Sequence, residues 1–415
     1  NGNLKILSNA VGEHSVLSNI IKLVTDAQRR KPKIQRLGDA VSAWFVPFVL
    51  IVSLLTLGVC YGFLELDFQA SLLRAVAVLV IACPCAMGLA TPTAVMVGLG
   101  RAAKHGILIK GADTAERLAG VQTVIFDKTG TLSTGQFIVS KIDTRLEDTE
   151  YIKSVVLSLE RYSSHPIARS LVSSFKDAKE IKFQEVQETK GVGIKGKDSL
   201  GNVFEIRGNV NRVSENDILE NDLLVLKNGN VIGELSIADE IKKEAFFTIN
   251  ELNELGIRSV LLSGDSKEKC EKIAQLLGIT QVYAQKKPDE KLSLVQEISE
   301  SSTSAFVGDG INDAPSLAGA SVGISLSDAT EAAIQSAQVL LLHSRIDYLV
   351  TAIKLSRLTY STIKQNLFWA FCYNIVAIPM AAAGCLSPML AALAMAMSDV
   401  VVIGNSLRLR TAGLN

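Results

Sequence analysis

Three long stretches of the chain contain no charged side chain, and they dominate its pattern of hydrophobic positions. They cover residues 41–64, 75–100 and 367–398, and each reaches the ~20 residues that a helix needs to cross a bilayer. The third stretch has room for two helices, because Pro379 and Gly384 offer a turn inside it. The pattern therefore predicts four transmembrane helices, which cover 41–64, 72–100, 366–385 and 387–408.

Basic residues beside these stretches give the predicted helices a direction. Arg101 and Lys104 follow the second stretch and Arg408 follows the third, whereas the connecting turns ELDFQ and CLS contain no Lys or Arg. Because positively charged flanks stay on the cytoplasmic side, both predicted hairpins enter the bilayer from the cytoplasm. We therefore expect a multi-pass integral membrane protein, in the plasma membrane, whose residues 101–364 are cytoplasmic.

Between the second and third stretches the pattern changes to alternating strands and helices. The apolar runs VQTVIFD, RSVLL and SAFVG each lead into a loop that contains Asp, and the helical patterns KEKCEKIAQLLG and DAPSLAGA follow the last two. Such repetition predicts a parallel sheet covered by helices. Ligands bind beyond the carboxyl ends of the strands in these sheets, so the three loops are predicted to meet at one site.

The first and third loops offer a nucleophile and a cation site. Asp127 begins the loop DKTGTLSTG, where its carboxylate can attack phosphorus and form an acyl phosphate. The loop GDGINDAP contains Asp309, Asn312 and Asp313. Their hard oxygen atoms are the ligands that Mg²⁺ prefers.

The second loop and a lysine downstream complete the predicted site. In SGDS, Ser263 and the Gly264 amide can donate hydrogen bonds to phosphoryl oxygens, and Asp265 follows them. Lys291 supplies a point positive charge. An isolated Asp after a strand is more often a helix cap or a turn former. Nucleophile, cation ligands, donors and counter-charge together nevertheless predict a phosphoryl-transfer site.

Two cysteines one residue apart interrupt the second apolar stretch, in the segment IACPCAMGLATP. In an unbroken helix Cys83 and Cys85 would point about 200° apart, but Pro84 opens the helix and lets both sulfurs face one side. Thiolates select soft ions such as Cu(I) or Zn(II). The alternative is a pair of small buried apolar residues. We expect no disulfide among the six cysteines, because they lie in or beside apolar stretches or in a reducing compartment.

Residues 136–235 interrupt the predicted sheet and are long enough to form a domain with its own core. They contain the segments SLERYSSHPIAR, KGVGIKG and IRGNV. A lone His or a lone pair of glycines is weak evidence for a ligand site, but Pro166 stiffens the turn that carries the His165 imidazole. The remaining predicted boundaries are 21–40 for a cytoplasmic linker helix, 101–135 with 236–345 for the sheet domain, and 346–365 for a stalk helix.

Taken together, DKTGT, GDGINDAP and Cys-Pro-Cys in an apolar helix resemble the heavy-metal (P1B-type) branch of the P-type ATPases, specifically its copper(I)-transporting subfamily. The resemblance covers nearly the whole chain. It implies a multidomain membrane protein with α-helical transmembrane segments and an α/β haloacid-dehalogenase-like phosphorylation domain. An α+β nucleotide-binding domain would be inserted into that domain. The implied activity is ATP-driven copper(I) export through an aspartyl phosphate at Asp127.

The resemblance also assigns residues to each site. Mg²⁺ would be held by Asp127, Thr129, Asp309 and Asp313, with Asn312 nearby. Further catalytic roles would fall to Lys128, Thr129, Ser263, Gly264, Asp265 and Lys291. The adenine and ribose would contact Glu160, His165, Gly191, Gly193, Gly208 and Asn209. Transported copper(I) would bind at Cys83, Cys85, Tyr373, Asn374, Met395 and Ser398. One departure is Ser164, which stands where the family usually has Glu.

The identity of the metal depends on the fourth predicted membrane helix. Zinc and cadmium relatives carry an Asp at the position of Met395, so the thioether here favours copper(I). The family pattern Met-x-x-Ser-Ser continues through Ser398, but Asp399 replaces its last residue. An acidic residue within a membrane helix is a functional candidate. Because of Asp399, a divalent ion remains an alternative to copper(I) as the transported ion.

The resemblance is to the carboxy-terminal part of such a pump. Residues 1–20 resemble the end of an actuator domain, and the chain contains no Thr-Gly-Glu triplet, which in the family promotes dephosphorylation. Related phosphatases carry a second Asp two positions after the nucleophile, where this chain has Thr129, so hydrolysis of the phosphoenzyme is expected to be slow without outside help. The alternatives are a zinc or cadmium pump, and a truncated product that binds nucleotide or metal without transport.

The expected ligands and partners follow from this reading. ATP is the substrate, Mg²⁺ the cofactor and Cu(I) the transported ion. The family implies delivery of copper by a cytoplasmic copper chaperone. We expect a lipid membrane as surroundings, a monomer, and no nucleic-acid partner.

Overall fold

The computed structural model describes residues 32–144, 147–189, 192–208, 223–308, 313–326, 331–343 and 345–414. The chain divides into two compact units, which are Asn1–Thr131 with Glu244–Asn415, and Leu132–Lys243. The predicted actuator remnant over 1–20 and most of the predicted linker helix over 21–40 lie outside the described residues.

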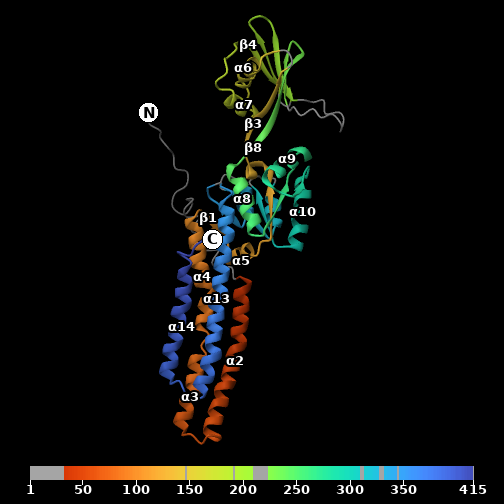
Figure 1. Cartoon of the computed structure of the whole chain (residues 1–415). Coiled ribbons are helices and arrows are strands. Elements are labelled where there is room, and N and C mark those ends of the chain that lie inside the picture. The colour runs from red at the N-terminus through yellow and green to blue at the C-terminus, as the bar shows by residue number, and fades with distance from the viewer. Residues whose placement is uncertain are drawn as a thin grey trace, which may run out of the picture. The chain divides into compact units, whose positions relative to one another are not determined.

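Long apolar helices of the first unit run side by side as a bundle (Figure 1). They are α2 (Lys33–Gly62), α3 (Phe68–Ile81), α4 (Cys85–Lys104), α13 (Tyr348–Ala382) and α14 (Pro388–Arg408). Small side chains such as Ala77, Ala90 and Ala381 are fully buried between them, which lets neighbouring backbones approach closely. Large apolar side chains such as Trp44 and Leu393 are exposed on the outside of the bundle, as contact with lipid requires.

Three helical stretches in the described part of the chain are long and apolar enough to cross a membrane, namely Ile34–Gly62, Phe68–Lys104 and Pro388–Arg408. The span predicted over 366–385 is not among them. It forms the second half of α13, where the polar residues Asn366 and Asn374 lower the hydropathy. Both asparagines are buried, so α13 turns its polar positions toward the other helices of the bundle.

The second predicted span is broken where the sequence places its proline. Helix α3 ends at Ile81 and α4 begins at Cys85, with Pro84 in the position before the first helical residue. Proline lacks an amide hydrogen and its ring clashes with the preceding turn. The prediction of a local opening at this point is confirmed.

A sheet of parallel strands forms the rest of the first unit. In the described residues its strand order is β1-β13-β12-β11-β2-β9-β10, and β1 alone runs antiparallel to its neighbour. The strands are β1 (Ile107–Ile109), β2 (Thr123–Asp127), β9 (Arg258–Leu262), β10 (Gln281–Tyr283), β11 (Ser304–Gly308), β12 (Val322–Leu326) and β13 (Val339–Leu341). Because β2, β9 and β11 are adjacent and parallel, the loops that follow them leave from the same edge of the sheet.

Helices cover this sheet and connect it to the bundle. They are α5 (Ala112–Ala119), α8 (Lys243–Glu254), α9 (Lys267–Leu277), α10 (Pro288–Ser301), α11 (Ala314–Gly319) and α12 (Glu331–Ser336). The strands are mostly apolar, and all five residues of β2 and of β11 are buried, as expected for a parallel sheet covered on both faces. This architecture and the bundle confirm the predicted fold class.

The second unit is an antiparallel sheet with two helices packed against it. Its strand order is β3-β8-β7-β6-β5-β4. The elements are β3 (Ser133–Thr144), α6 (Thr149–Glu160), α7 (Pro166–Ser174), β4 (Phe183–Thr189), β5 (Gly193–Asp198), β6 (Val203–Gly208), β7 (Leu223–Lys227) and β8 (Asn230–Ile241). Ile152, Val155, Phe204 and Leu235 are fully buried in its core. The unit is wider than the predicted 136–235, because the long strands β3 and β8 pair close to both of its ends.

Candidate functional site

The nucleophile predicted from the sequence lies at the carboxyl end of β2, an interior strand of the sheet. Asp127 is 5% exposed, and the Thr129 amide donates a hydrogen bond to its Oδ2 at 2.9 Å. Gly130 follows with φ +70°, a left-handed conformation that glycine adopts without strain. The turn DKTGT thereby folds back toward Asp127 and fixes its carboxylate.

Lys291 joins two of the predicted loops. Its ammonium contacts Oδ1 of Asp127 and donates to Oδ1 of Asp313 at 3.0 Å. Burial on its own would lower the pKa of Lys291, but the two carboxylates outweigh burial and raise the pKa. Lys291 therefore stays charged and neutralises part of the negative charge that the two buried aspartates bring together.

The loop after β9 contributes a second ion pair. The Lys128 ammonium is buried and contacts Oδ2 of Asp265. Ser263 is 3% exposed, and its hydroxyl accepts a hydrogen bond from the Asp265 amide at 3.2 Å. The Gly264 Cα lies against the Lys286 carbonyl, since a Cβ added there would come within 3.4 Å of that oxygen. The structure thus brings Asp127, Lys128, Ser263, Asp265, Lys291 and Asp313 into one polar cluster.

The carboxylate oxygens in this cluster are suitable ligands for Mg²⁺. The buried carboxylates of Asp127 and Asp313 are hard oxygen ligands of the kind that Mg²⁺ selects, and they already share one cation in Lys291. The remaining predicted ligands, Asp309 and the nearby Asn312, lie outside the described residues.

Sequence reasoning did not single out two residues beside the nucleophile. The Thr131 hydroxyl is buried and has no hydrogen-bond partner among the described residues, although it stands in the DKTGT motif. Cys270 on α9 is fully buried, and its thiol donates to the Asp265 carbonyl at 3.8 Å. Burial raises the pKa of this thiol. Its position could not be read from the local pattern, because the contact depends on how α9 packs.

The second unit contains a cavity of about 460 Å³. Four residues of the predicted nucleotide site line it, namely Glu160, His165, Gly193 and Gly208, while Gly191 and Asn209 lie outside the described residues. Gly193 has φ +154°, and a Cβ there would lie 2.0 Å from the Ile206 carbonyl oxygen. Only glycine allows β5 and β6 to pair so closely at the cavity wall.

His165 also has a structural role at this cavity. Its Nδ1 accepts a hydrogen bond from the Ile167 amide at 3.3 Å and caps α7, which begins at Pro166. A ring nitrogen that accepts is not protonated, so the proton of the neutral imidazole lies on Nε2. The ring can therefore donate a hydrogen bond through Nε2 to a ligand.

Glu160 and Glu188 place two carboxyl groups on the same cavity. Glu160 is 8% exposed. Burial, and secondly the charge of Glu188, raise its pKa to about 7. Sequence reasoning missed Glu188, which comes from β4 and has no local signal beyond its place just before the glycine-rich segment KGVGIKG.

A small cavity lies within the helical bundle at the break between α3 and α4. Five predicted copper ligands line it, one from the break and four from α13 and α14, and these are Cys83, Tyr373, Asn374, Met395 and Ser398. The cavity therefore combines sulfur and oxygen donors from segments that are far apart in the sequence. The Tyr373 hydroxyl is buried and has no hydrogen-bond partner among the described residues.

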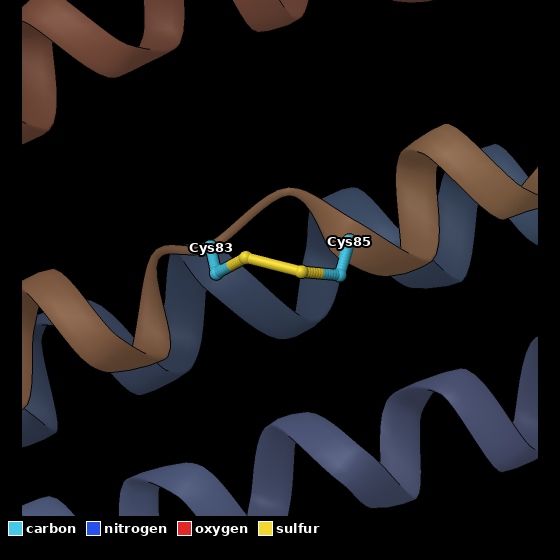
Figure 2. Close-up of a disulfide and its surroundings, with 2 residues drawn as sticks. All are labelled: Cys83 and Cys85. Carbon is cyan, nitrogen blue, oxygen red and sulfur yellow. A yellow bond between two sulfur atoms is a disulfide. The ribbon is translucent and has the colours of Figure 1, made fainter.

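The sixth predicted ligand, Cys85, faces Cys83 across Pro84 (Figure 2). Their Cα atoms are 5.5 Å apart, and the two sulfurs form a disulfide. The expectation that no cysteine forms a disulfide is therefore wrong for this pair. The physical reason is the helix opening at Pro84, which turns both side chains to one side and brings them within bridging distance. The expectation that both sulfurs face one side is confirmed.

A network of buried polar side chains lies on the bundle side nearer the sheet. The Asn366 amide donates to the Ala90 carbonyl at 3.2 Å and to the Ser406 hydroxyl at 2.9 Å. Ser406 and Thr93 lie within hydrogen-bond distance of each other at 3.0 Å. These contacts fix the register of α4, α13 and α14. Helices α4 and α14 run parallel. About two turns before Thr93 and Ser406 stand Ala86 on α4 and Asp399 on α14, so Asp399 is level with the residue that follows Cys85.

Comparison with known proteins relates these features to a family. A haloacid dehalogenase-like hydrolase family matches residues 121–321. The copper-exporting P-type ATPase of Staphylococcus haemolyticus is 41% identical over 99% of this chain and 53% of its own length. The copper-exporting P-type ATPase of Staphylococcus saprophyticus is 39% identical, with the same coverage of both chains. The chain thus spans about half the length of these curated relatives.

A solved structure matches the fold of nearly the whole chain. The crystal structure of a zinc-transporting PIB-type ATPase in its E2.Pi state has a TM-score of 0.83 and 30% sequence identity. The match covers 96% of this chain and 68% of the other chain. The bundle, the parallel sheet and the inserted unit are therefore parts of one architecture shared with that enzyme.

Proposed function

Since the chain belongs to the PIB-type ATPases, we propose that the protein uses ATP to export copper(I) from the cytoplasm across the plasma membrane. The observation that carries the choice of copper is the cavity at the helix break. A cysteine sulfur, a thioether, a phenol and an amide from Cys83, Met395, Tyr373 and Asn374 meet there. Sulfur ligands select soft ions.

The sulfur pair must be reduced to bind the ion. Two thiolates in an apolar bundle are costly unless a cation neutralises them, so binding of a soft monovalent ion offsets the cost of burial. Because free copper is scarce in the cytoplasm, a cytoplasmic copper chaperone is the proposed source of the ion.

The polar cluster at the sheet supplies the chemistry of energy coupling. A carboxylate oxygen of Asp127 would attack the γ-phosphorus of ATP, forming a new oxygen–phosphorus bond while the bond to the β-phosphate oxygen of ADP breaks. Lys291 and the Thr131 hydroxyl would interact with phosphoryl oxygens. Asp127, Asp313 and Asp309, with the Thr129 main chain, would hold Mg²⁺, which neutralises negative charge on the phosphates.

Breakdown of the phosphoenzyme needs a group from elsewhere in the protein. The position two residues after Asp127 holds Thr129, which cannot act as the carboxylic acid and base that hydrolases of this fold use there. The residues of this chain are therefore proposed to form the aspartyl phosphate readily and to hydrolyse it slowly.

A zinc or cadmium ion is a second candidate, which Asp399 favours. One of its carboxylate oxygens is buried in the bundle and has no hydrogen-bond partner among the described residues. A carboxyl group beside two cysteine sulfurs adds a hard oxygen donor, which suits a divalent ion better than a soft monovalent ion. A zinc-transporting enzyme also shares this architecture.

The two metals can be distinguished with the full-length protein in proteoliposomes under reducing conditions. We expect Cu(I) to stimulate ATP hydrolysis at least tenfold, Zn(II) to have little effect, and Asp399→Ser to retain the Cu(I) response. Stimulation by Zn(II) alone, lost in Asp399→Ser, would replace copper with zinc as the substrate. The double variant Cys83→Ser/Cys85→Ser should lose stimulation by either ion.

A further inference from the structure

Two carboxyl groups at the cavity of the second unit have opposite environments. Glu160 is the last residue of α6 and is 8% exposed. Glu188 lies near the end of β4 and is exposed to solvent, and it lines the same cavity. Carboxyl groups whose surroundings differ in this way divide into an acid and a carboxylate.

A hydrogen bond holds the Glu188 carboxyl group in place. The Ser163 hydroxyl donates to Oε1 of Glu188 at 2.5 Å. The Ser163 oxygen also accepts from the His165 amide at 3.2 Å, so the exposed carboxylate is tied to the turn that carries the imidazole. Glu188 therefore provides a fixed hydrogen-bond acceptor at the rim.

The charges around Glu160 favour its protonated form. Glu188 on β4 adds a negative charge, and His165 before α7 and Arg207 on β6 are the other titratable or charged groups that line the cavity. Arg207 is 3.9 Å from Glu205 on its own strand, which offsets its charge. The lining residues from α7, β5 and β7 are uncharged. The pKa of Glu160 near 7 agrees with this balance.

We propose that Glu160 and Glu188 read the Watson–Crick edge of adenine as a donor and acceptor pair. The protonated Glu160 carboxyl donates to the ring nitrogen N1, and the Glu188 carboxylate accepts from the exocyclic amine at N6. This inference rests on the proposed function, with the base of ATP bound in this cavity. It makes Glu188 a specificity-determining residue supplied by β4.

The arrangement explains how the site can work without the acidic residue that related proteins carry before the histidine. Ser164 occupies that position here, and Glu188 supplies a carboxylate from a different element of the same cavity. Guanine presents an acceptor at O6 and a donor at N1, the reverse of adenine. It would leave both carboxyl groups facing unmatched partners, and buried unmatched polar groups weaken binding strongly.

Protonation of Glu160 should make nucleotide binding depend on pH. If binding requires the proton, affinity falls as the pH rises through 7, by roughly tenfold between pH 7 and pH 8.5. Glu160→Gln provides a permanent donor in place of the acid. It should retain binding of ATP and lose this part of the pH dependence, because all other groups are common to both proteins.

The test is isothermal titration calorimetry of the full-length protein with the β,γ-methylene analogues of ATP and GTP, at pH 6.5 to 8.5. We expect Glu188→Gln to reduce the preference for the adenine nucleotide by about tenfold. Glu185→Gln is the matched control, since it removes an exposed carboxylate of the same strand that does not line the cavity. It should leave the preference unchanged.

Each outcome decides a different point. Equal pH profiles for the wild type and Glu160→Gln, or an unchanged preference in Glu188→Gln, would overturn the reading of adenine by this pair while binding of ATP persists. Because Glu188 is exposed, its variant does not depend on repacking of the core. Failure of the wild type to bind either analogue at any pH would instead refute the proposed nucleotide site, and the inference with it.

Discussion

The ammonium group of Lys291 lies 3.0 Å from a carboxylate oxygen of Asp313, although the two residues come from different connections of the sheet. The same ammonium also contacts Asp127. The parallel order of the strands produces this meeting, because β2, β10 and β11 lead into Asp127, α10 and Asp313 at one edge of the sheet. The cation thus holds the nucleophile and a proposed Mg²⁺ ligand together before any ligand arrives.

Replacing Lys291 by Gln should therefore affect both stability and chemistry. Removal of one partner from a buried ionic cluster leaves uncompensated charge, and we expect a loss of about 3–5 kcal/mol in the free energy of unfolding of the sheet part. Formation of phosphoenzyme from ATP should fall by at least about 100-fold. Hydrogen exchange of β2 and labelling from ATP measure the two effects.

Lys272→Gln, which changes an exposed lysine on α9, serves as the control and should alter neither quantity. Wild-type labelling in Lys291→Gln would show that the contact with Asp127 has no part in the reaction.

Pro84→Ala tests the opening of the membrane helix. Alanine allows α3 and α4 to continue as one helix, in which Cys83 and Cys85 would point about 200° apart. We expect the reduced full-length protein to lose tight binding of Cu(I) in the membrane segment, measured as bound copper per protein in competition with a chelator. Pro92→Ala is a matched control, because Pro92 lies inside α4 and away from the cavity. Tight binding by Pro84→Ala would contradict the role of the break.

The raised pKa of Glu160 predicts how the stability of the second unit depends on pH. Burial raises the pKa from 4.5 to about 7, so the folded unit binds the proton more tightly than the unfolded chain does. The stabilisation is complete below pH 4.5 and is lost as the pH rises to about 7. The loss amounts to about 3 kcal/mol as an order of magnitude.

Glu160→Gln should remove that pH dependence and make the unit more stable than the wild type at pH 8. Hydrogen exchange of the α6 amides measures the difference. Equal protection of the wild type at pH 5 and pH 8 would show that Glu160 stays ionised in the folded unit.

The features of this structure that depend on local sequence could be predicted from the sequence. Pro84 determines a helix break by its own covalent structure, and the meeting of Asp127 with Asp313 follows from strand order in a parallel sheet. The bundle was predicted from apolar runs, although Asn366 and Asn374 make the second half of α13 too polar to be recognised by hydropathy alone.

The parts that could not be predicted depend on packing between distant segments. Glu188 reaches the cavity because β4 is the edge strand next to β5, and Cys270 reaches Asp265 because of how α9 lies on the sheet. The joining of Cys83 to Cys85 also depends on three-dimensional geometry, since the spacing alone is compatible with free thiols.

Phosphorylation of Asp127 by ATP is proposed to occur when a soft ion occupies the site at Cys83 and Cys85. Labelling of the reduced full-length protein with ATP radioactive in the γ-phosphate tests this coupling directly. We expect an acid-stable, hydroxylamine-labile label that requires Cu(I) and vanishes in Asp127→Asn and in Cys83→Ser/Cys85→Ser. A label that persists in Asp127→Asn, or that forms equally well without any metal, would contradict it.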